Sequence, residues 1–184
     1  MNPAVSEVSL NWLYGRLTGK TISESRKVYA DLKMLFVEQQ DVPLPDQEIY
    51  RVEWYAPAPA GKIGGLFWGV THLQSGTVGD EYFMTHGHFH EDSSRDEYYI
   101  VASGSGSLLQ MDRSGNTWAQ EMPAGSISYI DGKHAHRVVN VGDEPLVFWA
   151  CWGTDAGYDY DTIARDGFGL RVVKSNGKPV LVSR

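Results

Sequence analysis

Short runs of alternating apolar and polar residues fill the chain from about residue 47 onward. Most of them end at glycine, proline, asparagine or aspartate, which favour turns. They predict β-strands at 49–55, 66–73, 82–90, 97–102, 107–111, 117–122, 126–130, 134–140, 146–152, 170–173 and 180–182. Nine to eleven short strands at regular spacing are typical of a barrel or sandwich, so we expect an all-β barrel over about 47–184.

A different period precedes the strands. Thr21 and Glu24 have the spacing of a helix capping box. Apolar residues then recur at helical spacing, at Val28, Leu32, Leu35 and Phe36. This pattern predicts one short helix, about 23–36 within a helical segment of about 21–37, on the outside of the barrel. Residues 1–20 are only weakly patterned, and we expect one domain over 1–184.

Composition narrows the classes of protein that the chain fits. Its 184 residues suit a single domain, and a net charge of −7 argues against nucleic acid or an anionic membrane as the main partner. No apolar run approaches the ~20 residues of a membrane helix. The single cysteine, Cys151, excludes an internal disulfide and suits a reducing compartment. We therefore expect a cytoplasmic protein without a membrane partner.

Histidines and one glutamate form the candidate chemistry. In a strand, His88 and His90 point to the same face, and Glu97 begins the returning strand opposite them. His136 would arrive from another strand of the barrel. Three imidazoles and a carboxylate suit Fe, Mn, Ni, Co, Cu or Zn better than Mg or Ca, and four ligands leave open positions on an octahedral ion. We predict a metal site of His88, His90, Glu97 and His136.

The remaining histidines leave an ambiguity. Strand alternation cannot choose between His134 and His136, and it places His86 on the same face as His88. We interpret His86 and His134 as rim residues around the ligands, and His72 as an ordinary polar residue near a turn. A His-x-His pair alone also occurs in strands that bind no metal. Glu97 and the distant His136-x-x-x-Asn140 favour the metal site.

These residues carry a resemblance to a known family. His88-x-His90 with Glu97 and Gly104 resembles the first cupin motif, and Pro123-x-Gly125 leading to His136-x-x-x-Asn140 resembles the second. The six-residue gap before Glu97 is longer than in most cupins and is similar to that of the cupin-type (archaeal-type) glucose-6-phosphate isomerases. Further similarity, over about 65–170, lies in Phe83-Met84-Thr85-x-Gly87, Ala135-His136-Arg137, Gly142-Asp143-x-Pro145 and Asp155-Ala156-Gly157-x-Asp159-Tyr160-x-Thr162-Ile163.

The resemblance implies a fold, an activity and partners. The fold is a cupin barrel, also called a double-stranded β-helix or jelly roll. The activity is interconversion of glucose 6-phosphate and fructose 6-phosphate, in glycolysis or gluconeogenesis. It implies one divalent transition metal per chain, Fe²⁺ first, with Mn²⁺, Ni²⁺, Zn²⁺ and Co²⁺ as alternatives. It also implies a sugar phosphate substrate and a homodimer.

Roles for individual residues follow from the same resemblance. Residues matching Thr71, Thr85, Gly87 and Tyr99 hold the substrate phosphate in the family, and Tyr160 adds a further hydroxyl donor for the substrate. Thr85 and Gly87 would face away from His88 in a regular strand, so we predict a β-bulge at Gly87. Glu97 is the candidate base for proton transfer through an enediolate. A metal-assisted hydride shift needs no base, and the sequence does not separate the two routes.

Three residues depart from the family's pattern, and two other functions are alternatives to the isomerase. Trp152, Tyr158 and His86 stand where the family often has tyrosine, histidine and lysine, which bears on sugar selectivity or rate. One alternative is another metal-dependent cupin enzyme, such as a dioxygenase. The other is a non-catalytic sugar-binding cupin. The phosphate-type donors oppose the first alternative, and the complete set of metal ligands opposes the second.

Overall fold

The computed structural model describes residues 6–12, 14–38 and 44–184, and its regular structure is mostly β. The two short α-helices are α1 (Tyr29–Leu32) and α2 (Tyr160–Asp166), and one 3₁₀ turn, η1, spans Lys33–Leu35. The strands are β1 (Val8–Asn11), β2 (Arg16–Gly19), β3 (Ile22–Val28), β4 (Glu48–Tyr55), β5 (Leu66–Leu73), β6 (Thr77–Val78), β7 (Glu81–Tyr82), β8 (Glu97–Ser103), β9 (Ser105–Met111), β10 (Thr117–Pro123), β11 (Ile127–Ile130), β12 (Ala135–Asn140), β13 (Leu146–Gly153), β14 (Leu170–Ser175) and β15 (Lys178–Ser183).

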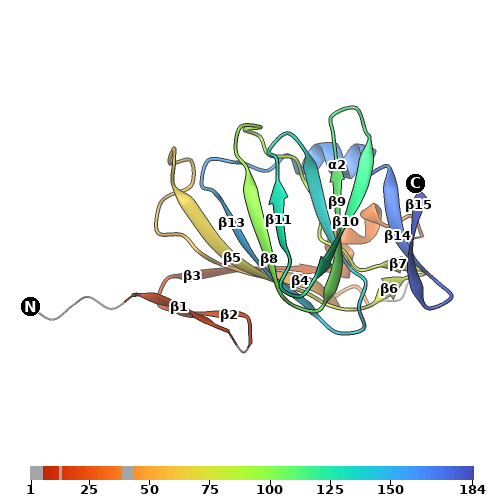
Figure 1. Cartoon of the computed structure of the whole chain (residues 1–184), viewed down its shortest axis with the longest axis horizontal. Coiled ribbons are helices and arrows are strands. Elements are labelled where there is room, and N and C mark those ends of the chain that lie inside the picture. Colours follow the sequence, from red (N-terminus) through yellow and green to blue (C-terminus); the bar gives the residue numbers. More distant parts are fainter. Residues whose placement is uncertain (1–5, 13, 39–43) are drawn as a thin grey trace, which may run out of the picture.

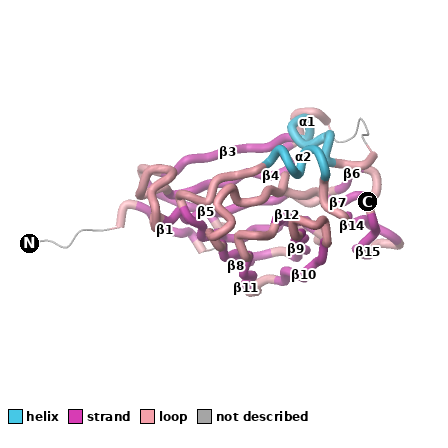
Figure 2. The backbone as a smooth tube through the Cα atoms, turned by 90° about the horizontal axis from the view of Figure 1, so that it is seen from above, coloured by secondary structure: helices cyan, strands magenta, loops and turns pink. Residues whose placement is uncertain are grey.

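A six-stranded sheet forms the largest wall of the barrel. Its order is β11-β8-β13-β5-β4-β3, and Figure 2 shows it running from β3 and β4 on one side to β8 and β11 on the other. The sheets β10-β9-β12 and β15-β14-β7-β6 form the rest of the barrel, and their labelled strands lie to the right of β8 and β11 in Figure 1. From β8 to β13 the chain crosses repeatedly between the six-stranded sheet, with β8, β11 and β13, and the three-stranded sheet, with β9, β10 and β12, which is the jelly-roll arrangement of cupins. The predicted all-β cupin fold is confirmed.

Alternation along the strands fills the barrel. Phe148 and Trp152 on β13 face inward, while Val147 and Trp149 between and beside them belong to a separate cluster on the outer face of the sheet. The inner cluster also contains Phe83, from the segment after β7. Each wall thus buries one face of its strands against the other, as a two-layer β fold requires.

The hairpin β1-β2 covers part of the outer face. Leu17 of β2 packs with Val70, Val147 and Trp149 in the outer cluster, and the ring of Trp12 meets Trp149 edge-on, with 4.7 Å between centroids. Residues 1–20 showed only weak pattern in the sequence, because the hairpin is short and its apolar contacts lie on another element.

The predicted helix over 23–36 is wrong for its first half. Ile22–Val28 forms strand β3, which pairs antiparallel with β4, and α1 begins only at Tyr29. The Thr21–Glu24 box caps nothing; instead Asp31 accepts a hydrogen bond from the Val28 N–H at 3.0 Å. Only the second half of the predicted segment is helical, in α1 and η1. The first half is a strand because it pairs with β4, and the local pattern of apolar residues does not reveal that pairing.

The predicted strand over 82–90 is also interrupted. Only Glu81–Tyr82 forms a strand, and beyond it Met84 and His88 make isolated bridges to β12, while Phe89 bridges to Asp159. Helix α2 was not predicted; Asp159 caps it by accepting a hydrogen bond from the Thr162 N–H. No helix in the described ranges is both long and apolar enough to cross a membrane.

Candidate functional site

The segment before the histidines carries one extra residue against β12. Met84 pairs with Val139 and His88 with His136, so four steps on one side oppose three on the other. Gly87 has a φ of +76°, which glycine adopts without strain, and His86 and Gly87 together face Arg137. This is the bulge predicted at Gly87. Because of it, Thr85, Gly87 and His88 all line the same cavity.

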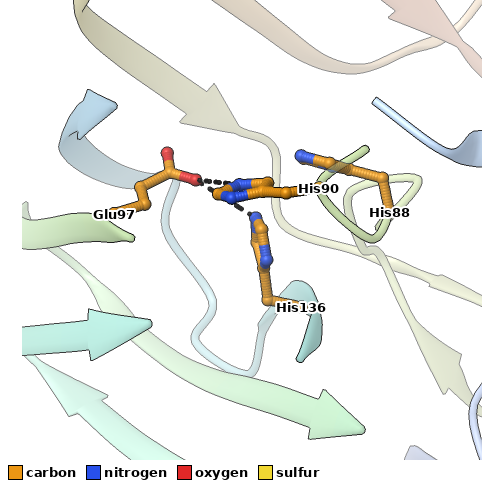
Figure 3. Close-up of side chains that lie close together, drawn as sticks. All are labelled: His88, His90, Glu97 and His136. Carbon is orange, nitrogen blue, oxygen red and sulfur yellow. Dashed lines mark hydrogen bonds and ion pairs between the residues drawn. The ribbon is translucent and has the colours of Figure 1, made fainter. Parts of the chain in front are cut away.

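Four side chains converge at the end of this segment. Figure 3 shows His88, His90 and His136 directed toward the carboxylate of Glu97. One ligand atom from each residue lies within 4.8 Å of those from the others. Nε2 of His90 and Nε2 of His136 each lie 3.3 Å from Oε2 of Glu97. His90, Glu97 and His136 are at most 5% exposed, so the cluster sits inside the barrel wall.

The chemistry of this cluster fits a transition-metal ion. Nε2 of His88 and both ring nitrogens of His136 are buried without a hydrogen bond, a costly state for polar atoms unless something else binds them. Burial, with His136 and His90 nearby, lowers the pKa of His88 well below its usual value, which leaves a neutral ring with a lone pair to donate. Burial alone would raise the pKa of Glu97, but the close contacts of its carboxylate with the His136 and His90 rings outweigh burial and lower that pKa. Neutral imidazoles and an ionised carboxylate are the forms that bind metal.

The loop before Glu97 orients His90. Nδ1 of His90 donates to the carbonyl oxygen of Arg95, which leaves Nε2 free to face the cluster. Arg95 is itself fixed by Asp155, whose Oδ2 accepts from Nε at 2.9 Å. Asp96 accepts from the N–H of Gly132, where a Cβ would meet the Arg95 carbonyl at 2.2 Å. The long gap before Glu97 therefore builds a braced loop behind the ligands.

The other histidines lie outside the four-residue cluster. The ring of His134 meets Trp118 edge-on, with centroids 4.8 Å apart. His86 lies against Tyr160 at the same centroid separation, and its Nδ1 is 2.8 Å from the Gly87 carbonyl oxygen. His72, interpreted from the sequence as a residue near a turn, is instead buried within β5, opposite Arg51.

A cavity of about 280 Å³ opens beside the cluster. His88, Glu97 and His136 form one part of its wall, and the hydroxyl and glycine residues predicted to bind substrate form more of it: Thr71, Thr85, Gly87, Tyr99 and Tyr160. His90 lies behind this wall. The structure thus gathers all nine predicted site residues in one place.

Several hydroxyls in the cavity are arranged to donate. The Thr85 hydroxyl oxygen accepts from the Val138 N–H at 3.1 Å, so its own proton is free for a ligand. Tyr50 has the same arrangement, since its oxygen accepts from the His86 N–H at 3.5 Å. Burial raises the pKa of Tyr50 to about 12 and raises that of Tyr99 well above its usual value, so both stay protonated. Such donors suit an oxygen-rich, anionic ligand.

An aromatic wall closes the side nearest His88. Trp152 donates its indole N–H to the Tyr158 hydroxyl at 2.8 Å. Tyr158 lies parallel to Tyr160, with centroids 5.7 Å apart, and its ring approaches His88 at 5.0 Å. Trp152 and Tyr158, which depart from the resembled family, therefore act as a pair at the cavity wall.

Sequence reasoning missed the contribution of β3 and β4. Ser25 and Lys27 on β3, and Tyr50, Val52 and Trp54 on β4, also line the cavity. The signal was available in β4, where Tyr50, Val52 and Trp54 alternate with polar residues. In β3 it was hidden because the segment was interpreted as helix, and a helix does not place Ser25 and Lys27 on one face.

Comparison with known proteins adds an independent finding. A family model described as glucose-6-phosphate isomerase matches residues 20–183, which includes every residue of the site.

Individual relatives agree with that match. The chain is 39% identical over 156 residues to a glucose-6-phosphate isomerase of Thermococcus litoralis, covering 83% of this chain and 81% of the relative. It is 38% identical over 157 residues to one of Pyrococcus horikoshii, covering 83% and 82%. It is also 38% identical over 178 residues to a putative glucose-6-phosphate isomerase 2 of Rhizobium meliloti, covering 94% and 86%.

Solved structures give only a distant likeness. Oxalate decarboxylase of Bacillus subtilis matches with a TM-score of 0.46 and 21% identity, over 59% of this chain and 26% of that one, which is too low to carry an inference. The family model and the relatives decide the matter: this chain belongs to the glucose-6-phosphate isomerase family.

Proposed function

We infer that this chain is an aldose–ketose isomerase that interconverts glucose 6-phosphate and fructose 6-phosphate at a metal-dependent site. The observation that carries the proposal is the cluster of His88, His90, Glu97 and His136 beside a cavity lined with hydroxyl donors. Relatives named glucose-6-phosphate isomerase, at 38–39% identity over most of their length, support the same reaction.

We propose both where a metal ion binds and which ion it is. His88, His90, Glu97 and His136 would hold one divalent transition metal, and we propose Fe²⁺. When bound, such an ion polarises a carbonyl and stabilises negative charge on neighbouring oxygens. The softer nitrogen ligands favour Fe²⁺, Mn²⁺, Co²⁺, Ni²⁺ or Zn²⁺ over Mg²⁺.

Glu97 has a geometry that suits proton transfer. Its Oε2 approaches His90 and His136, while the other oxygen points away from the three rings (Figure 3). In the proposed route this free oxygen takes the proton from C2 of the aldose and returns it to C1 of the same molecule. The C2–H electron pair forms the C1–C2 double bond while the π pair of the C1 carbonyl moves to O1, which gives an enediolate. The proton of the C2 hydroxyl then passes to O1, the C2 carbonyl forms, and C1 takes back the proton from Glu97, so no other reactant is needed.

The remaining cavity residues would bind and orient the sugar phosphate. We propose that Thr71, Thr85, Gly87 and Tyr99 hold the phosphate through hydroxyls and a backbone N–H. Tyr160 and the Trp152–Tyr158 pair would cover the sugar carbons beside His88.

Turnover of fructose 6-phosphate by chelator-treated protein tests the function, with each divalent metal restored in turn. We expect Fe²⁺ to restore the highest rate and His88→Ala to abolish the restoration. Failure of all the metals to restore turnover, in protein that still binds one, would overturn the isomerase proposal.

Deuterated water tests the route. With glucose 6-phosphate as the substrate, we expect deuterium at C1 of the fructose 6-phosphate formed, because a proton held on Glu97 can exchange with solvent. Product free of deuterium would favour a direct hydride shift, in which Glu97 serves only the metal.

We also propose that the protein is a cytoplasmic homodimer. Tyr98, Ile100, Ile127 and Tyr129 lie together on the outer face of β8 and β11, and three of them are at least 50% exposed. An apolar patch of this kind on a sheet face marks a contact surface. The free Cys151 suits a reducing compartment. Light scattering on the purified protein would test the dimer; a monomeric mass would contradict it.

A further inference from the structure

Strand β3 presents two basic side chains to opposite faces. Arg26 points away from the cavity, where its Nε lies 3.0 Å from Oε2 of Glu48 and its Nη2 donates to the Asp46 carbonyl. Its neighbour Lys27 lines the cavity. The alternation follows from the strand itself, because successive residues face opposite sides.

Lys27 has no counter-ion of its own. Within the described ranges it makes no ion pair with a carboxylate, although it is half-buried. It is also the one lysine or arginine among the described residues that line this cavity. A half-buried ammonium group facing a cavity is an anion-binding element.

The register of the sheet places Lys27 away from the metal ligands. Lys27 pairs with Tyr50, whose hydroxyl contacts the N–H of His86 in the bulge. Glu97 lies at the other end, opposite Trp152, which pairs with Phe67. Thr71 lies four residues further along β5 than Phe67, or about 13 Å along the strand. The cavity therefore has a metal end and a Lys27 end, with Thr71 and the bulge between them.

A phosphate group needs more than the neutral donors near the bulge. It carries a charge of about −1.5 to −2 at neutral pH. Thr71, Thr85, Tyr99 and the Gly87 N–H are all uncharged donors. Arg137 does not line the cavity, and its Nε and Nη2 already donate to the carbonyl of His86. Among the described residues, Lys27 is the lysine or arginine that lines the cavity.

We propose that Lys27 is a substrate-binding residue that pairs with the phosphate group of the sugar phosphate. The proposal rests on the isomerase function proposed above and adds a residue to it. Lys27 would fix which end of the sugar lies beside Glu97, because the phosphate and the reacting carbons lie at opposite ends of the substrate.

Calorimetry with sorbitol 6-phosphate, which has no carbonyl and cannot be isomerised, tests the inference on metal-loaded protein. The variant is Lys27→Met, and the matched control is Arg26→Met, which removes the same charge from the other face of β3. We expect the Kd to rise about tenfold or more in Lys27→Met, as for loss of a charge-assisted bond, and to change less than about twofold in the control. Lys27→Arg should restore most of the affinity. Unchanged metal content in each variant verifies the fold of the site.

The outcomes separate the two proposals. Equal Kd values for Lys27→Met and Arg26→Met overturn the role of Lys27, even if the unmodified protein converts fructose 6-phosphate. Weaker binding by Lys27→Met alone, in protein without turnover, supports Lys27 and removes the isomerase function. Failure of the unmodified protein to bind sorbitol 6-phosphate overturns the role of Lys27 as well.

Discussion

At the scale of single residues, Glu97 combines two properties that are rarely found together. It is buried, yet the close contacts with the His136 and His90 rings keep its pKa low, so it is charged inside the barrel. One oxygen faces the histidines and the other faces away from them. A single carboxylate can therefore serve a metal and a substrate.

Glu97→Gln should separate metal binding from proton transfer. The amide keeps the shape of the side chain but cannot take a proton. We expect kcat for fructose 6-phosphate, measured with saturating metal, to fall by about 10²–10⁴-fold, the usual loss when a general base is removed. Glu121→Gln, an exposed carboxylate on β10, is the control and should keep the original rate. A Glu97→Gln enzyme with normal kcat would exclude this residue as the base.

His72 makes stability depend on pH. Burial, and then the charge of Arg51, lowers its pKa, so the folded protein holds this ring neutral at a pH where the unfolded chain protonates it. The stability that this provides is complete above the unfolded pKa of about 6.5 and is lost as the pH falls below it.

Replacing His72 should flatten that dependence. We expect the free energy of unfolding to decrease less between pH 8 and pH 5 in His72→Gln than in the unmodified protein, with each unit of pKa shift worth about 1.4 kcal/mol. Urea titrations of metal-free protein at the two pH values measure the difference. Parallel losses in both proteins would show that His72 is not responsible.

The sequence predicted His88, His90, Glu97 and His136 as metal ligands, but strand alternation alone could not choose among all the histidines. Alternation made His134 and His136 equivalent. The structure distinguishes them because the ring of His136 lies beside His88 and His90, whereas that of His134 lies against Trp118. That choice depends on how β12 pairs with β9 and with the bulge, which is a contact between distant parts of the chain.

At the scale of elements, the bulge at Gly87 is the feature on which the cavity depends. It brings Thr85 and His88 to one side although a regular strand would separate them. Arg137, fully buried, holds the bulge through two hydrogen bonds to the His86 carbonyl and packs its guanidinium 4.7 Å from the Phe168 ring centre. The bulge was predictable from the sequence because a regular strand would turn Thr85 away from His88, and Gly87 lies between them.

Gly87→Ala should damage the site beyond the cost of backbone strain. A Cβ there would lie 2.9 Å from Cε2 of Phe168 and 3.1 Å from the His136 carbonyl oxygen. Gly115→Ala is a matched control, because Gly115 has a φ of +86° but no atom within 4 Å of the added carbon. Left-handed backbone costs about 1–2 kcal/mol in either variant. We expect Gly87→Ala to lose more stability than that and to raise KM, with KM unchanged in the control.

Equal stabilities and equal KM values for the two alanine variants would show that the bulge tolerates displacement. Thermal unfolding and steady-state kinetics on the same preparations provide both measurements.

Elements were harder to predict than the site. The segment 22–28 was interpreted as helix because apolar spacing is the only local signal, while its actual partner β4 lies beyond a long connection. Hairpin β1-β2 and the short helix α2 were not predicted, since each depends on packing against a distant surface. The strands of the barrel itself were predictable because each one buries a face and therefore alternates.

At the scale of the whole molecule, the four proposed metal ligands come from separate parts of the fold. His88 and His90 come from the irregular segment after β7, Glu97 begins β8 in the six-stranded sheet, and His136 lies on β12 in the facing sheet. A bound ion would therefore connect the two walls of the barrel. Ligands that bind only the folded state stabilise it.

Metal removal should lower the melting temperature. With metal at about 100 times its Kd, binding contributes about 2.7 kcal/mol, which for a chain of this size corresponds to roughly 5–10 °C. Scanning calorimetry with and without chelator measures the change. His136→Ala should abolish it, and His134→Ala should retain it. An identical melting temperature for chelated and metal-loaded protein would place the ion elsewhere or exclude it.

The position of Lys27 on β3 has a consequence for how this protein can be altered. Strand β3 lies at the edge of its sheet and belongs to the first 28 residues, whereas every proposed metal ligand lies after residue 87. The charged contact to the tail of a substrate would thus come from a part of the chain separate from the part that would carry out the chemistry, while Thr71, Thr85, Gly87 and Tyr99 would add neutral donors. Grafting a different edge strand onto this barrel offers a route to catalysts that accept uncharged sugars, while the reactive centre stays untouched.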